Sequence, residues 1–116
     1  MLLDHNLPHK LRAILASQGS HDVFTASYMG WGGLQNGELL RAAEENGIDV
    51  LVTGDGTLRY EQNLTGRRLA IIALSANNWP LVRECAAQIQ SAIDQARPGS
   101  FRLLDCGDFS RKRSLQ

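Results

Sequence analysis

The chain has 116 residues, of which 43% are hydrophobic and 21% are charged, and these proportions fit one globular domain. Twelve basic and twelve acidic side chains cancel, which argues against a protein that coats nucleic acid through bulk positive charge. The longest apolar run, residues 69–74, is far too short to span a membrane, and the first residues do not resemble a signal peptide. We therefore expect a cytoplasmic protein with no membrane partner.

The two cysteines, Cys85 and Cys106, lie far apart in the sequence and lack the spacing of a zinc site. In a cytoplasmic protein such residues are normally reduced. We expect two free thiols, with Cys85 packed as a small hydrophobic side chain.

The first half of the chain begins with a short apolar strand at residues 1–3. A helix is expected over residues 8–18, because proline suits the first helical turn and Gly19 favours a helix end. Residues 22–25 predict a second short strand. The glycine-rich segment 28–37, which contains Trp31, predicts a loop.

The second half continues the alternation of helices and strands. A helix over residues 37–46 is expected to be capped by Asn36. A single long helix is expected to begin at Asn78-Trp79-Pro80 and to be broken by Arg97-Pro98-Gly99. Three further strands are expected at residues 50–53, 69–74 and 101–104. The predicted domain covers residues 1–105, and residues 106–116 are expected to form a loose tail.

Strands that alternate with helices, two of them apolar on both faces, predict an α/β fold with a central parallel sheet. Helices are expected on both sides of this sheet. In such folds ligands bind beyond the carboxyl ends of the strands. This rule directs attention to the polar residues that follow each strand.

Three carboxylates are expected to meet at that edge. Asp4 follows the first strand, Asp55 follows the third, and Glu38 lies in the first turn of the helix that leads into the third. Two like charges about 4 Å apart repel by roughly 4 kcal/mol at an effective dielectric constant of about 20, and a divalent cation removes this penalty. Carboxylate and water oxygens suit Mg²⁺ or Mn²⁺. Each carboxylate also has a purely structural explanation, as a turn residue or at a helix start.

Several segments of the chain resemble the short PIN-like family DUF5615. The matching segments are Leu2-Leu3-Asp4-His5-Asn6-Leu7-Pro8, then Gly30-Trp31 with Asn36-Gly37-Glu38-Leu39-Leu40, then Leu51-Val52-Thr53-Gly54-Asp55 with Leu58. PIN-like domains are metal-dependent ribonucleases, and many are toxins of bacterial toxin–antitoxin pairs. The resemblance implies that Asp4 and Asp55 are metal-site carboxylates. With right-handed crossovers, it also implies a three-layer PIN-like domain with the strand order 3-2-1-4-5, counted along the chain.

The sequence departs from the family pattern at three positions. Relatives commonly have an acid where His5 stands, an aspartate where Asn36 stands, and an acid or asparagine where Thr57 stands. Because Asn36 is neutral, Glu38 is expected to supply the middle carboxylate. The side chain of His5 is expected to point away from Asp4 if strand alternation persists, and we leave it out of the site.

Together these features predict a ribonuclease that hydrolyses single-stranded RNA with Mg²⁺ or Mn²⁺ as cofactor. The expected metal-binding and catalytic residues are Asp4, Glu38 and Asp55. Supporting roles are expected for Asn6, Asn36, Thr53 and Thr57, and RNA phosphate contacts for Arg59, Arg67 and Arg68. The aromatic and apolar loop around Trp31 suggests a partner protein, either an antitoxin or a second copy of the chain.

Two other functions stay open. One is a catalytically inactive PIN-like module that binds a partner, which metal binding and RNA cleavage would distinguish from the enzyme. The other is a receiver-like signalling domain, which shares acids after its first and third strands. A receiver needs a lysine after its fifth strand, and Leu104-Asp105-Cys106 offers none.

Overall fold

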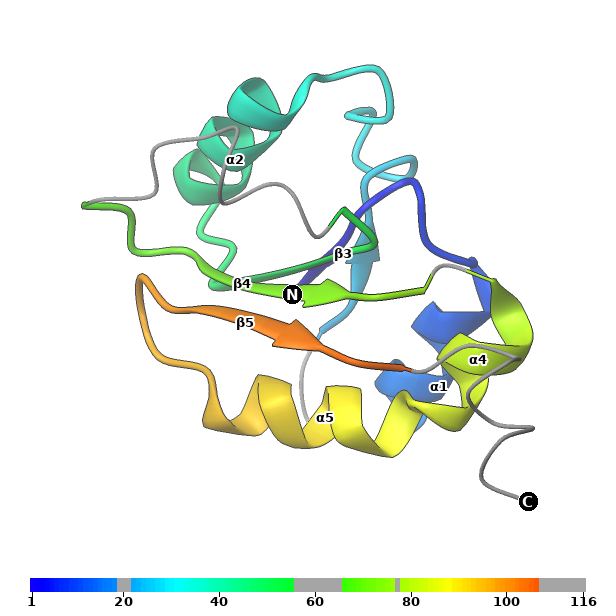
Figure 1. Cartoon of the computed structure of the whole chain (residues 1–116). Helices are drawn as coiled ribbons and strands as arrows, with labels where there is room; N and C mark the ends of the chain where they lie inside the picture. Colours follow the sequence, from blue (N-terminus) through cyan, green and yellow to red (C-terminus); the bar gives the residue numbers. More distant parts are fainter. Residues whose placement is uncertain (19–21, 56–65, 77, 107–116) are drawn as a thin grey trace.

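All five expected strands form, and they lie parallel to one another in one sheet (Figure 1). The computed structural model describes residues 1–18, 22–55, 66–76 and 78–106. In chain order the strands are β1 (Leu2–Leu3), β2 (Phe24–Thr25), β3 (Val50–Thr53), β4 (Ala70–Leu74) and β5 (Phe101–Leu104). The parallel pairing of all neighbours confirms the predicted α/β class.

The order of the strands, however, differs from the expected 3-2-1-4-5. The sheet runs β2-β1-β3-β4-β5, so β3 is central and β2 forms an edge. All four residues of β3 are buried, whereas β2 has only two residues and its Phe24 is partly exposed. A strand that is apolar on both faces needs a helix layer above and below. At the centre of the sheet, β3 has both, because Leu51 and Val52 belong to the cores on opposite faces.

The described residues form helices α1 (Lys10–Gln18), α2 (Asn36–Glu45), α4 (Trp79–Glu84) and α5 (Ala86–Gln95). The long helix expected after Asn78 is thus two helices that meet at Cys85. Gln35 rather than Asn36 precedes α2 as its N-cap, so Asn36 is the first helical residue. In the parts of the chain that the structure describes, no helix has the length and apolarity needed to cross a bilayer.

Helices cover both faces of the sheet (Figure 1). On one face, α1, α4 and α5 bury a core that includes Leu11, Leu15, Val82, Ile89, Ile93, Val52 and Ile72. On the other face, α2 buries a core that includes Leu39, Leu40, Ala43, Leu51 and Ile71. Because side chains alternate along a strand, Ile71 and Ile72 belong to different cores.

The two outer connections of the sheet have opposite hands. The chain moves from β1 to β2 in one direction across the sheet and from β4 to β5 in the other. Their helices, α1 and α5, nevertheless pack in the same core on the same face. The expectation of right-handed crossovers throughout is therefore wrong, although nearly all parallel connections are right-handed.

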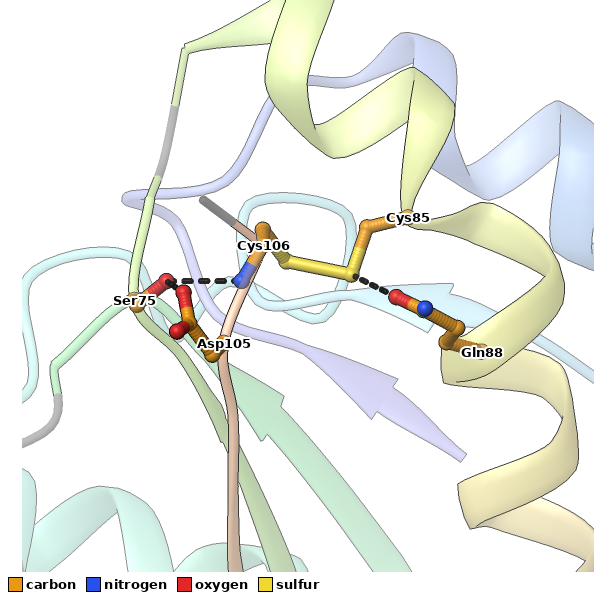
Figure 2. The surroundings of a disulfide bond; sticks show 5 residues. All are labelled: Ser75, Cys85, Gln88, Asp105 and Cys106. Carbon is orange, nitrogen blue, oxygen red and sulfur yellow. Dashed lines mark hydrogen bonds between the residues drawn. A yellow bond between two sulfur atoms is a disulfide. The ribbon is translucent and has the colours of Figure 1, made fainter. Parts of the chain in front are cut away.

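The two cysteines form a disulfide, contrary to the expectation of two free thiols (Figure 2). Their Cα atoms are 5.5 Å apart although 21 residues separate them in the sequence. The chain runs back along α5 and forward again along β5. The residue before α5 and a residue just after β5 consequently meet at one end of the sheet. Distance along the sequence was therefore a poor guide to the pairing of these residues.

Gly99, in the turn before β5, offers a test of how closely this turn approaches the start of β4. Gly99 has φ of 78°, and an added Cβ would lie 2.8 Å from the carbonyl oxygen of Arg67. Gly47 has φ of 74° but has no atom within 4 Å of such a Cβ. The left-handed conformation alone costs alanine about 1–2 kcal/mol. We expect Gly99→Ala to lower the free energy of unfolding by clearly more than Gly47→Ala, as measured by urea denaturation. Equal losses would contradict the close approach.

Candidate functional site

The candidate site lies at the carboxyl edge of the sheet, where β1 and β3 end side by side. The connection after β1 leads to β2 on one side, whereas β3 lies on the other side of β1. Such a reversal leaves a crevice at the carboxyl ends of two neighbouring strands, and ligands bind there in open α/β sheets. Asp4 directly follows β1, and Thr53 is the last residue of β3.

A buried carboxylate forms the centre of this site. Asp4 is only 4% exposed. Its Oδ2 accepts a hydrogen bond from the Thr53 hydroxyl at 2.7 Å, and its Oδ1 accepts one from the backbone N–H of His5, also at 2.7 Å. The Thr53 oxygen in turn accepts the backbone N–H of Asp55 at 3.1 Å. One hydroxyl therefore connects the two aspartates that the sequence predicted as partners.

Two asparagines hold the residues that follow β3. The backbone N–H of Gly54 donates to Oδ1 of Asn6 at 3.0 Å, which ties the loop after β1 to the loop after β3. Asn36, at the start of α2, donates from Nδ2 to Oδ2 of Asp55 at 3.1 Å. The structure thus brings Asn6, Asn36 and Thr53 together with both aspartates. We call Asp4, Asn6, Asn36, Thr53 and Asp55 the aspartate cluster.

His5 also contacts the aspartate cluster, and the expectation that its side chain points away is wrong. Its Nδ1 lies 2.9 Å from Oδ1 of Asp4, with the imidazole 50% exposed and the carboxylate 3% exposed. The reason is local: β1 ends at Leu3, and His5 lies in the turn that follows. Strand alternation no longer applies in a turn, so it could not predict the direction of this side chain.

The remaining predicted residues do not all lie near the aspartate cluster. Glu38 is exposed in the first turn of α2. Arg67 and Arg68 precede β4 and therefore lie at the opposite, amino edge of the sheet. There Arg67 Nη1 lies 2.6 Å from Oε1 of Glu44 in an ion pair. Thr57 and Arg59 fall outside the described residues.

The chemistry of the cluster suits a hard cation. Carboxylate oxygens of Asp4 and Asp55 and the amide oxygen of Asn6 are the kind of ligand that Mg²⁺ prefers, and Mg²⁺ commonly uses one or two carboxylates with water. Within the described residues, no group of three or more His, Cys, Asp or Glu side chains lies close enough to hold a metal ion. The expected set of Asp4, Glu38 and Asp55 is therefore not gathered into one three-carboxylate site, whereas the Asp4 carboxylate is linked through the Thr53 hydroxyl to the backbone of Asp55.

A second polar group at the same edge was missed by the sequence reasoning. Ser75 follows β4 and Asp105 follows β5, and the Ser75 hydroxyl donates to Oδ1 of Asp105 at 3.4 Å (Figure 2). The backbone N–H of Cys106 donates to the same hydroxyl at 2.8 Å. The rule that singled out Asp4 and Asp55 applies equally to the polar residues after β4 and β5, and it would have found this pair.

A hollow of about 510 Å³ lies at the amino edge, remote from the aspartate cluster. Its walls come from the end of α2, the starts of β3 and β4, and the segment after α5; they include Ile48, Leu69, Ala96, Arg68 and Arg97. Arg68 is the one predicted site residue among those that line it. The aspartate cluster and this hollow thus lie at opposite ends of the sheet.

No family model, curated protein or solved structure matches this chain. The PIN-like resemblance therefore stands on the residues quoted for it, and the aspartate cluster has to be judged by its own geometry.

The shared hydroxyl of Thr53 can be tested by an isosteric substitution. Thr53→Val leaves the buried Oδ2 of Asp4 and the N–H of Asp55 without their partner, so we expect a loss of about 2–3 kcal/mol in the free energy of unfolding. Thr25→Val is the matched control, because the Thr25 oxygen only accepts the N–H of Tyr28, at 3.0 Å, and should cost about 1 kcal/mol. Thr53→Ser should restore most of the loss. Equal costs for the two valine variants would contradict a special role for Thr53.

The Glu44–Arg67 pair predicts a pH dependence of stability. The hydrogen bond from Arg67 lowers the pKa of Glu44 below its ordinary value of 4.5, partly opposed by burial and aided by the Arg68 N–H. Because the folded pKa is the lower one, the pair stabilises the fold above pH 4.5 and this contribution is lost as the pH falls through the lowered pKa.

We therefore expect Glu44→Gln to cost about 1 kcal/mol at neutral pH and progressively less in acid. The exposed neighbour Glu45 provides the control, since Glu45→Gln should change stability little at any pH. Denaturation curves at a series of pH values measure both. A cost for Glu44→Gln that does not change with pH would rule out the ion pair as its cause.

Proposed function

We propose that this chain is a metal-dependent ribonuclease that hydrolyses single-stranded RNA with Mg²⁺ or Mn²⁺. The observation that supports the proposal is the link from Asp4 through Thr53 to Asp55 at the carboxyl edge, beside the reversal of strand order. Two aspartates at this position are also the residues that the PIN-like resemblance assigns to a metal site. A three-layer PIN-like fold, a cytoplasmic location and a role as the toxin of a toxin–antitoxin pair belong to the same proposal.

In this proposal Asp4 and Asp55 hold the cation, and the other residues of the cluster orient them. A bound Mg²⁺ would lower the pKa of a coordinated water and neutralise charge on the attacked phosphate. Thr53 fixes one oxygen of Asp4, and Asn36 fixes one oxygen of Asp55. Both cysteines are joined in a disulfide, so neither supplies a covalent nucleophile. Direct attack by water would leave a 5′-phosphate on the product.

In this proposal a protein partner binds at the loop between β2 and α2. Trp31 packs against the core under α2, whereas Tyr28 is 78% exposed. Exposed tyrosine is common at protein interfaces, because its ring offers a large contact area and its hydroxyl a hydrogen bond. Tyr28 rather than Trp31 is therefore the residue with which an antitoxin or a second copy of the chain would make contact.

One observation favours the inactive binding module as a second candidate. Both carboxylate oxygens of Asp4 already accept hydrogen bonds from protein groups. In this second candidate Asp4 fastens the loops after β1 and β3 and holds no cation. The strand order is also that of receiver domains, but Asp105 follows β5 where a receiver needs lysine, and Asp105 is bonded to Ser75.

The ribonuclease proposal is tested with the full chain and a pool of single-stranded RNAs. Cleavage should require Mg²⁺ or Mn²⁺, stop with EDTA and give 5′-phosphate ends. Asp4→Asn and Asp55→Asn should each lower the rate by at least about 100-fold, because the cation is then poorly held. Asp49→Asn is the matched control, since Asp49 is exposed and lies just before β3, at the opposite edge.

Binding of Mn²⁺ by calorimetry separates the two candidates. The ribonuclease should bind Mn²⁺, and Asp55→Asn should weaken that binding while Asp49→Asn leaves it unchanged. Metal-independent cleavage would refute the mechanism. A wild type that cleaves no RNA, together with equal Mn²⁺ affinity in Asp55→Asn and Asp49→Asn, would instead favour the binding module.

A further inference from the structure

The disulfide fastens the connection between β4 and β5 (Figure 2). Cys106 follows β5, so this bond lies at the carboxyl edge of the sheet, as the aspartate cluster does. Cys85 is the residue at which α4 ends and α5 begins. Cys106 lies just beyond β5, where its backbone N–H donates to the Ser75 hydroxyl and the Ser75 N–H donates to Leu104. The chain after β5 is thus held to β4 by hydrogen bonds and to the helices by one covalent bond.

The two sulfur atoms differ in access. Cys85 is 2% exposed, whereas Cys106 is only partly buried. Exchange of a disulfide needs a thiolate to reach one sulfur and the other sulfur to leave with negative charge. Cys85 is both the last residue bonded to α4 and the residue that precedes α5, and its backbone N–H donates to the carbonyl oxygen of Leu81. Oε1 of Gln88 lies 3.2 Å from its Sγ, so that a free Cys85 thiol has an acceptor for its proton.

From these positions we infer that Cys85 and Cys106 form a reversible redox site that small-molecule thiols reduce and that controls how firmly α4 is held. A thiolate attacks Sγ of Cys106, forming a mixed disulfide while the Cys85–Cys106 bond breaks. Cys85 leaves as a thiolate and takes a proton from water. A second thiolate attacks the small-molecule sulfur of the mixed disulfide and releases Cys106 as a thiolate, which takes a proton from water. Two electrons reduce the protein disulfide, and two thiols become one disulfide.

Reduction would act on α4 before it acts on the rest of the fold. α4 has only six residues, and the disulfide holds its C-terminal end. Its other end contacts α1, where Nζ of Lys10 lies 5.8 Å from the centre of the Trp79 ring. α1 follows the loop that carries Asp4 and His5. The redox state of the pair is therefore connected to the loop after β1 through two packed helices, whereas α2 packs on the opposite face.

The redox chemistry is tested on the full chain, purified without reductant. We expect both thiols to become alkylated by iodoacetamide together as the ratio of dithiothreitol to its oxidised form rises, and to be protected again when it falls. In Cys85→Ser, the remaining Cys106 should exchange with oxidised glutathione at least about tenfold faster than Cys85 does in Cys106→Ser, because it is more accessible. Two free thiols in oxidising buffer, or faster exchange at Cys85, would overturn the inference.

Hydrogen exchange tests the effect on α4 and needs no variant. Comparing oxidised with reduced wild type, we expect amides of residues 78–85 to exchange at least about tenfold faster after reduction. Amides of α2 provide the internal control and should not change. Unchanged exchange in α4 would overturn the proposed control of this helix, and equal acceleration in α2 would show global loosening instead. These outcomes do not depend on whether the chain cleaves RNA.

Discussion

The hydrogen bond between the Thr53 hydroxyl and the buried carboxylate of Asp4 is the interaction on which the carboxyl edge depends. An ionised carboxylate loses several kcal/mol of hydration on burial unless donors replace the water. Thr53 and the His5 backbone supply those donors, and both come from residues whose positions are set by β1 and β3. The pairing of these two strands therefore fixes the geometry of the site. Conversely, the carboxylate holds the loops after both strands in place.

The protein itself supplies partners for both carboxylates of the aspartate cluster. An aspartate at position 36 would add a third negative charge next to Asp55, and repulsion would then favour a bound cation strongly. Asn36 instead donates a hydrogen bond to Asp55, and His5 lies against Asp4. Part of the role that a cation plays in an all-acidic site is thus taken by protein donors. His5 and Asn36 act together in this sense.

The sequence predicted the elements of the fold better than their arrangement. Five parallel strands followed from the apolar runs, and the placement of Asp4 and Asp55 at one edge followed from the rule on strand ends, because both depend on local patterns. The strand order was wrong, because β3 lies at the centre of the sheet and the short β2 at an edge, and no local pattern sets the order in which strands pair. The disulfide and the contact of His5 with Asp4 depend on where the chain turns, and no local pattern encodes that.

The carboxyl edge of the sheet carries two polar groups. One face of the sheet is covered by α1, α4 and α5 together. The aspartate cluster follows β1 and β3, and the Ser75–Asp105 pair with the disulfide follows β4 and β5. A connection whose hand is opposite to that of β1–α1–β2 brings α4 and α5 onto the same face as α1. If the connection from β4 to β5 had the same hand as β1–α1–β2, α4 and α5 would lie on the opposite face of the sheet, beside α2. Trp79 of α4 could not then contact Lys10 of α1. The hand of this one connection therefore places the disulfide where it can influence the loop that holds Asp4.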